Sequence, residues 1–395
     1  MLVLPLFFLY EQIYIEERYH ERIVSAFFAK LTDFQRSNIK KIAFIFTLLC
    51  CIILGYFSYM LDTDISHSES SWNKKMNTEP QVAADLLEVS KDATKVLCGT
   101  YVEGIHDIDM AHGGYWVNFM TWFRWDGDEI QDMADHFRIY RGVIKQKNIV
   151  KSYKSGNTHY QLVRMEAIVD KSFATKRFPL DGQQFVFYLE PFYTAKRVVL
   201  VADTKESNVN RNLDIDGYRF EKSLVSTYAY EYRNTRGDIE LEKSTDKNIV
   251  TELATGVRVK RDGFGLYAKC FIALYGCIIW SLLTLFINIY HHVDPLEMIP
   301  EALFGCVANI MVGASLLPEA LDMGLLEYVN IWGILIILTA TVIIINVNAI
   351  RHREALPDGT CYYAASFGRV MFYLITFFAV IGNIILPFIA YNHQF

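Results

Sequence analysis

The chain has 395 residues, of which 52% are hydrophobic and 21% charged, with a formal net charge of −6 at pH 7. The length accommodates two or three domains. The mild negative charge, without a basic run interleaved with aromatics, argues against a nucleic-acid partner. Hydrophobic residues gather in five runs, each near the roughly 20 residues that cross a bilayer as a helix. The runs are Ile42–Leu61, Leu266–Tyr290, 295–317, Leu325–Asn348 and Ala364–Tyr391.

The first run has the flanks of an uncleaved signal anchor. Lys40 and Lys41 precede it, and the bulky segment Gly55–Tyr59 offers no small-residue cleavage site. We therefore expect residues 1–41 to be a cytoplasmic arm, residues 42–61 to cross the membrane, and the next roughly 200 residues to lie outside. If each later apolar run also crosses the membrane, the basic segment Arg351–Arg353 lies in the cytoplasm, as the positive-inside rule requires.

The polar middle of the chain has the pattern of short strands. Residues 62–97 are expected to form a linker, with a short helix near Val82–Val89. In Tyr115–Trp125 apolar residues alternate with polar ones, and turn signals such as Asp126-Gly127 separate such segments. This pattern predicts an antiparallel β-sandwich over residues 98–261.

No signature of catalysis or of metal binding accompanies these elements. Seven cysteines are present, but only Cys98 falls in the polar middle region, which excludes an internal disulfide there. Neither zinc-ligand spacing nor a phosphate-binding loop nor a catalytic triad order occurs. We expect no enzyme activity, no cofactor and no bound metal.

Motifs in the order typical of one family run from the middle region to the fourth apolar run. Phe178–Gln183 matches an FPxDxQ loop, and Trp122–Asp126 matches an early-strand W-x-x-W-D pattern. Basic residues at Arg258–Arg261 and the segment Leu317–Glu319 follow. Over residues 98–391 the chain resembles the prokaryotic pentameric ligand-gated ion channels of the Cys-loop receptor superfamily.

Two features depart from that family's pattern. Lys171 and Phe185 stand near the places where animal receptors carry the two cysteines that bracket the loop, which prokaryotic members also lack. Family members usually begin with a cleaved signal peptide, without a cytoplasmic arm and an extra helix.

The resemblance implies an α+β membrane protein: an extracytoplasmic β-sandwich, then a four-helix transmembrane bundle over residues 262–395, with the N-terminal helix in addition. It also implies a homopentamer in the lipid of a bacterial inner membrane, with its large domain in the periplasm or outside the cell. Its ligand would be a small molecule or ion of unknown identity, and its permeant ions cations.

The resemblance further implies that the second channel helix lines a pore. Two anchors, Arg261 and Pro318, set its register and turn one helical stripe towards the axis: Glu297, Glu301, Phe304, Ala308, Met311 and Ser315. A carboxylate in hydrocarbon costs at least about 2.5 kcal/mol, which favours this stripe facing water. The competing stripe is Met298, Ala302, Gly305, Asn309, Val312 and Leu316. Pro300 would either kink the helix or mark its start.

Ligand and coupling residues follow from the same resemblance. Ligand-binding candidates are aromatic side chains, whose ring faces attract cations: Trp116, Trp122, Phe192, Tyr193, Tyr228, Tyr230 and Tyr232. Coupling candidates are Phe178, Pro179, Asp181, Arg261 and Pro318, with Asp181 and Arg261 as a partly buried ion pair. The alternative function is a non-conducting pentameric receptor or scaffold that keeps the channel fold.

Overall fold

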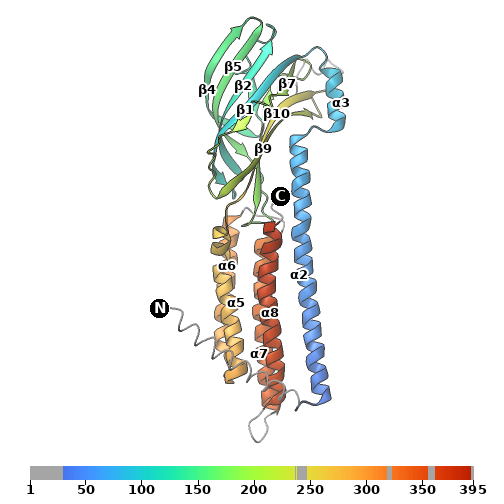
Figure 1. The fold of residues 1–395 in the computed structure, drawn as a ribbon, viewed down its shortest axis with the longest axis vertical. Helices are drawn as coiled ribbons and strands as arrows, with labels where there is room; N and C mark the ends of the chain where they lie inside the picture. Colours follow the sequence, from blue (N-terminus) through green and yellow to red (C-terminus); the bar gives the residue numbers. More distant parts are fainter. Residues whose placement is uncertain (1–29, 236, 238–246, 318–322, 355–360, 393–395) are drawn as a thin grey trace. The chain divides into compact units, whose positions relative to one another are not determined.

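The computed structural model describes residues 30–235, 237, 247–317, 323–354 and 361–392. The protein is α+β (Figure 1). Within the described ranges, four helical segments are long and apolar enough to cross a membrane, and they begin at Asp33, Gly265, Leu325 and Tyr362. These segments mark the chain as a membrane protein.

The chain forms two compact units. Of the residues that the structure describes, the helical unit comprises those within 30–60, 266–313 and 325–389, and the sheet unit comprises those within 61–265 together with a few later residues. One helix, α2 (Asp33–Met76), begins in the helical unit and ends in the sheet unit.

The sheet unit contains two sheets. One has the order β4-β5-β2-β1-β7, with β8 also paired to β1, and the other has the order β3-β6-β10-β9. Figure 1 shows β4, β5, β2 and β1 side by side. The strands are β1 (Thr94–Asp109), β2 (Gly114–Asp126), β3 (Phe137–Ile139), β4 (Gly142–Ser155), β5 (Thr158–Asp170), β6 (Gly182–Pro191), β7 (Val198–Ala202), β8 (Asn208–Val209), β9 (Tyr218–Glu231) and β10 (Ile249–Arg261).

Strand pairing differs from the expectation at one place. The other pairs are antiparallel, but β7 and β8 run parallel to β1. β7 follows β6, a strand of the opposite sheet, so the chain reaches β1 by crossing between sheets and not through a hairpin.

The inward faces of the two sheets share one core. In β2 every second residue from Tyr115 to Trp125 is buried, which confirms the predicted alternation. Phe119 of β2 packs on Phe187 of β6 with ring centroids 4.6 Å apart. Tyr115 packs edge-on against Phe185 at 4.9 Å.

The four-stranded sheet is covered on its second face as well. We call residues 61–76 of α2 the strap. Its side chains Trp72 and Met76 are buried and lie against Gly256 of β10, where an added Cβ would come within 2.8 Å of the indole and 2.9 Å of the thioether sulfur. Both faces of β10 are consequently buried.

The strap corrects the expected linker at residues 62–97. Helix α2 continues to Met76, α3 (Pro80–Val89) follows, and β1 starts at Thr94. The short helix expected near Val82–Val89 is present. The strap is polar overall, yet Ser68, Trp72 and Met76 lie four residues apart on one face, and the sheet beneath supplies the apolar surface that this face needs.

The helical unit contains α5 (Gly265–His291), α6 (Ile299–Leu316), α7 (Leu325–Glu354) and α8 (Tyr362–Asn392), besides the first part of α2. α6 has 18 residues, which gives it a length of roughly 27 Å at 1.5 Å per residue. Pro300 stands in its first turn, where a missing N–H costs nothing, so this proline marks the helix start. Glu297 lies in the short 3₁₀ turn Leu296–Met298 that precedes it.

Candidate functional site

The exposed face of α6 carries the predicted pore stripe. Glu297, Glu301 and Ala308 are exposed, and Phe304 and Met311 leave 76% and 69% of their surface uncovered. The competing stripe contains buried residues: Ala302 and Asn309 are 2% and 5% exposed. Side chains at Val312, Ser315 and Leu316 lie outside the described set, as does Pro318.

Asn309 explains which way α6 is turned. Its Nδ2 donates a hydrogen bond of 2.9 Å to Oδ1 of Asn330 on α7. An amide facing hydrocarbon would lose this partner, so the bond fixes the helix with Asn309 inward. Glu301 and Phe304 belong to the neighbouring stripe, about 80° and 140° around the helix from Asn309, so the same bond leaves them exposed.

The predicted ion pair of the coupling loop is present and lies deeper than expected. Nη2 of Arg261 is 3.0 Å from Oδ1 of Asp181, and both side chains are at least nine-tenths buried. Oδ2 of Asp181 accepts hydrogen bonds from Nε2 of Gln183 at 2.7 Å and from the hydroxyl of Tyr218 at 3.2 Å. Burial, with the adjacent carboxylate, raises the pKa of Tyr218 above its ordinary value. The carboxylate of Asp181 is therefore fully satisfied as an anion.

The loop itself is compact. The backbone N–H of Phe178 donates to the carbonyl of Thr175 at 2.9 Å, and that of Leu180 donates to the carbonyl of Arg177 at 2.8 Å. Phe178 and Pro179 are both buried, and the guanidinium carbon of Arg261 lies 5.7 Å from the Phe178 ring centre.

Lys171 and Phe185, at the two ends of the loop, lie close together. Nζ of Lys171 donates to Oε1 of Gln183 at 2.8 Å and lies 4.1 Å from the ring centre of Phe173 and 5.4 Å from that of Phe185. Burial lowers the pKa of Lys171 to about 7, with a further contribution from the positive charge of Lys75. The Lys171 side chain, bonded to Gln183 and resting on two aromatic rings, thus links the two ends of the loop without a covalent bond.

The aromatic ligand candidates fall into separate groups on the two sheets. On β2, Trp116 stacks on His106 at 6.0 Å, and Nε1 of Trp122 donates to Oδ2 of Asp203 at 3.2 Å. On the four-stranded sheet, Tyr228 packs on Tyr188 in the cluster that includes Trp72 of the strap.

The remaining candidates lie around the ends of β6 and β9. Tyr230 and Tyr232 contact each other edge-on at 4.9 Å. Tyr193 stacks on His136 at 5.6 Å, with the guanidinium of Arg197 over its ring, whereas Phe192 is exposed. One chain therefore does not gather the candidates of both sheets into a single pocket.

A buried pair of carboxyl groups was not predicted. Glu190 of β6 and Glu252 of β10 are 1% and 3% exposed. Glu190 accepts hydrogen bonds from Arg138 at 2.9–3.0 Å and from the Tyr232 hydroxyl at 3.0 Å. Burial, followed by the charge of Glu190 and a hydrogen bond with it, raises the pKa of Glu252 to about 8. Burial beside a second carboxyl group favours the protonated form of Glu252, and the pair lies beside Tyr228 and Tyr232.

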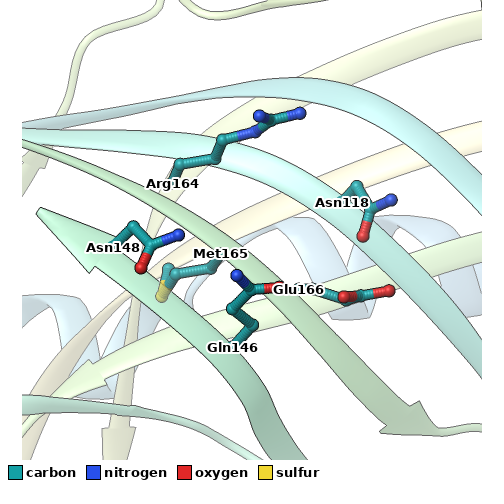
Figure 2. Close-up of a pocket in the computed structure, with 6 residues that line it drawn as sticks. All are labelled: Asn118, Gln146, Asn148, Arg164, Met165 and Glu166. Atoms are coloured by element: carbon teal, nitrogen blue, oxygen red, sulfur yellow. The ribbon is translucent and has the colours of Figure 1, made fainter. Parts of the chain in front are cut away.

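A shallow cavity opens on the outer face of the six-stranded sheet (Figure 2). Its volume is about 160 Å³, and its lining residues on β2, β4 and β5 are Asn118, Gln146, Asn148, Arg164, Met165 and Glu166. Arg164 is paired with Glu103 at 2.9 Å. An irregularity between Ile144 and Gln146 interrupts the β4–β5 pairing beside the cavity. The lining offers donors and acceptors in similar number, and no predicted site residue belongs to it.

No group of three or more metal-ligating side chains occurs within the described ranges. No protein-family model matches the chain, and no curated protein matches it.

Proposed function

We propose that the chain is a subunit of a cation-selective, ligand-gated channel of the pentameric type. In this proposal the two facing sheets are the extracytoplasmic β-sandwich, and α5, α6, α7 and α8 are the four-helix membrane bundle. The observation that carries the proposal is the two-sided character of α6. It presents Glu301, Phe304 and Met311 outward while Ala302 and Asn309 are buried against its own chain.

One residue of the outward face of α6, Glu301, is unsuited to lipid. A carboxylate held in hydrocarbon costs at least about 2.5 kcal/mol, so Glu301 needs water or a partner. Five copies of α6 around an axis would give rings of Glu297 and Glu301, which attract cations and repel anions. The ring of Phe304 one turn further along would be an apolar constriction that closes by dewetting.

The arrangement of the aromatic candidates is consistent with assembly. Trp116 and Trp122 lie on one sheet and Tyr228–Tyr232 on the other. A ligand enclosed by both groups must bind between neighbouring copies, as the family resemblance implies. Such a site would be gated through the loop that contains Asp181, because Arg261, the partner of this residue, stands four positions before α5.

The test does not require the ligand. Removing the Phe304 ring should open the apolar constriction, so Phe304→Ala in liposomes should leak sodium at least tenfold faster than the wild type and should favour sodium over chloride. Adding Glu301→Gln should reduce that preference. Val307→Ala is the matched control, because Val307 is also exposed on α6 but does not belong to the stripe that contains Phe304, Ala308 and Met311.

Two outcomes separate the proposal from its alternative. A five-fold assembly in which neither Phe304→Ala nor the wild type passes ions would favour a non-conducting receptor or scaffold. A leak of equal size in Phe304→Ala and Val307→Ala would refute the proposal that the stripe with Phe304 faces the pore axis.

A further inference from the structure

The strap contacts the loop that carries Phe178 and Asp181 at both of its ends. Arg177 stands just before Phe178, and Gln184 stands where the loop passes into β6. The strap reaches Arg177 through Asp64, and it reaches Gln184 through Ser68 and Lys75.

The first contact is an ion pair. Nε of Arg177 lies 3.4 Å from Oδ2 of Asp64, and Nζ of Lys176 lies 3.9 Å from its Oδ1. The Arg177 side chain is 2% exposed and that of Asp64 15%. A guanidinium this deeply buried depends on its carboxylate, because removing one half of a buried pair leaves a charge without compensation.

The second contact uses both ends of one amide. Nε2 of Gln184 donates to the backbone carbonyl of Ser68 at 3.0 Å, and its Oε1 accepts from Nζ of Lys75 at 3.4 Å. Gln184 is buried, so the strap provides partners that water does not supply there.

The strap is also attached to β6 and β10 themselves. Trp72 and Met76 pack on Gly256, the hydroxyl of Tyr188 donates to the carbonyl of Lys75 at 3.0 Å, and Glu69 pairs with Arg258 of β10. These contacts hold the strap independently of the loop, so the loop is fastened to an element that is itself fixed.

We propose that the strap is the positioning element of this loop, and that Asp64 and Gln184 mark its two fastening points. The role is the one a covalent bridge across the loop would have, at a place where the chain has Lys171 and Phe185 in contact and no cysteine pair. Holding the loop is independent of the proposed channel function. Its effect on gating rests on that function.

The proposal gives α2 a part in regulation. α2 is one helix from Asp33 to Met76, and its first part contains the apolar run that ends at Leu61. Asp64 stands three residues beyond that run. A movement of the membrane part of α2 would therefore change the position of the loop through the contacts of Asp64 and Ser68.

The experiment is hydrogen–deuterium exchange on the full chain in detergent, read at the amides of Phe178 and Leu180. Both amides are bonded within the loop, to Thr175 and Arg177, so their exchange reports its opening. Asp64→Asn should speed this exchange at least tenfold, and Asp64→Glu should restore it. Asp85→Asn is the matched control, since it removes the ion pair of Asp85 with Lys247, which stands before the first residue of β10 and so at the end of that strand opposite to Arg261, and it should change exchange less than twofold.

A general loss of packing would be seen as equal acceleration in Asp64→Asn and Asp85→Asn, and that result would overturn the proposal. Unchanged exchange in a folded Asp64→Asn protein would overturn it as well. If Asp64→Asn does not fold, Lys75→Met tests the other fastening point and should speed exchange several-fold, while wild-type exchange in that variant would refute the assignment. These readouts need no ion current, so the proposed function can fail while the positioning role stands.

Discussion

The buried pair Glu190 and Glu252 predicts a specific dependence of stability on pH. Glu252 has an ordinary pKa of 4.5 when exposed and about 8 in the fold. Because the folded protein holds this proton more tightly, the contribution is fully present below pH 4.5 and is lost as the pH rises towards 8. At 1.36 kcal/mol per pKa unit, the loss amounts to about 5 kcal/mol as an upper bound.

Glu252→Gln should remove this dependence. A glutamine amide donates a hydrogen bond to Glu190 at every pH, as the protonated acid does, and it carries no charge that burial penalises. At pH 8.5 we expect the variant to be more stable than the wild type by up to about 5 kcal/mol, and at pH 5 the two should agree within about 1 kcal/mol. For a unit of roughly 200 residues, each kcal/mol moves the unfolding midpoint by about 2–4 °C.

The assay is thermal unfolding of the full chain in detergent from pH 5 to pH 9, followed by tryptophan fluorescence. Glu231→Gln is the control, since Glu231 lies on β9 and is more exposed than Glu252. The reasoning would be refuted if the difference between Glu252→Gln and the wild type did not grow with pH, or if the variant were the less stable protein at pH 8.5.

Two further predictions concern the sheet unit. Asp181→Ala leaves the buried guanidinium of Arg261 without its carboxylate, so the free energy of unfolding should fall by about 3–5 kcal/mol. Thermal melts together with size-exclusion profiles check this, and a wild-type melt would contradict it. Gly256→Val places a branched side chain where a Cβ alone comes within 2.8 Å of Trp72. The variant should therefore lose about 1–3 kcal/mol of stability and shift the fluorescence of Trp72. An unchanged spectrum would mean that the strap does not lie on β10.

The strands were predictable because their period of two is a local signal. The alternation in Tyr115–Trp125 can be read without knowing what lies opposite, and the structure buries the residues that it marks. The pore stripe of α6 stays a prediction. Glu297 and Glu301 belong to one stripe, and the cost of placing carboxylates in hydrocarbon is the reason for choosing this stripe over its neighbour.

The strap was not predictable by the same means. Its segment contains charged and hydroxyl residues, so its composition resembles a linker, and the apolar positions Trp72 and Met76 gain meaning only against Gly256, about 180 residues later in the chain. The pair of Glu190 and Glu252 was not predictable for the same reason. Each residue alone resembles a solvated acid, and only the adjacent positions of β6 and β10 in the sheet bring them together.

The loop that contains Asp181 is held from two directions along the chain. Arg261 binds Asp181 and stands four residues before α5, the first helix after the sheets. Asp64 binds Arg177 and stands three residues after the apolar run of α2. Both ion pairs are mostly buried, so neither breaks without a cost of several kcal/mol. A change in the loop must therefore alter the chain on at least one of these two sides. Helix α2, with its apolar run, is therefore joined along the chain to one of these ion pairs, as α5 is to the other.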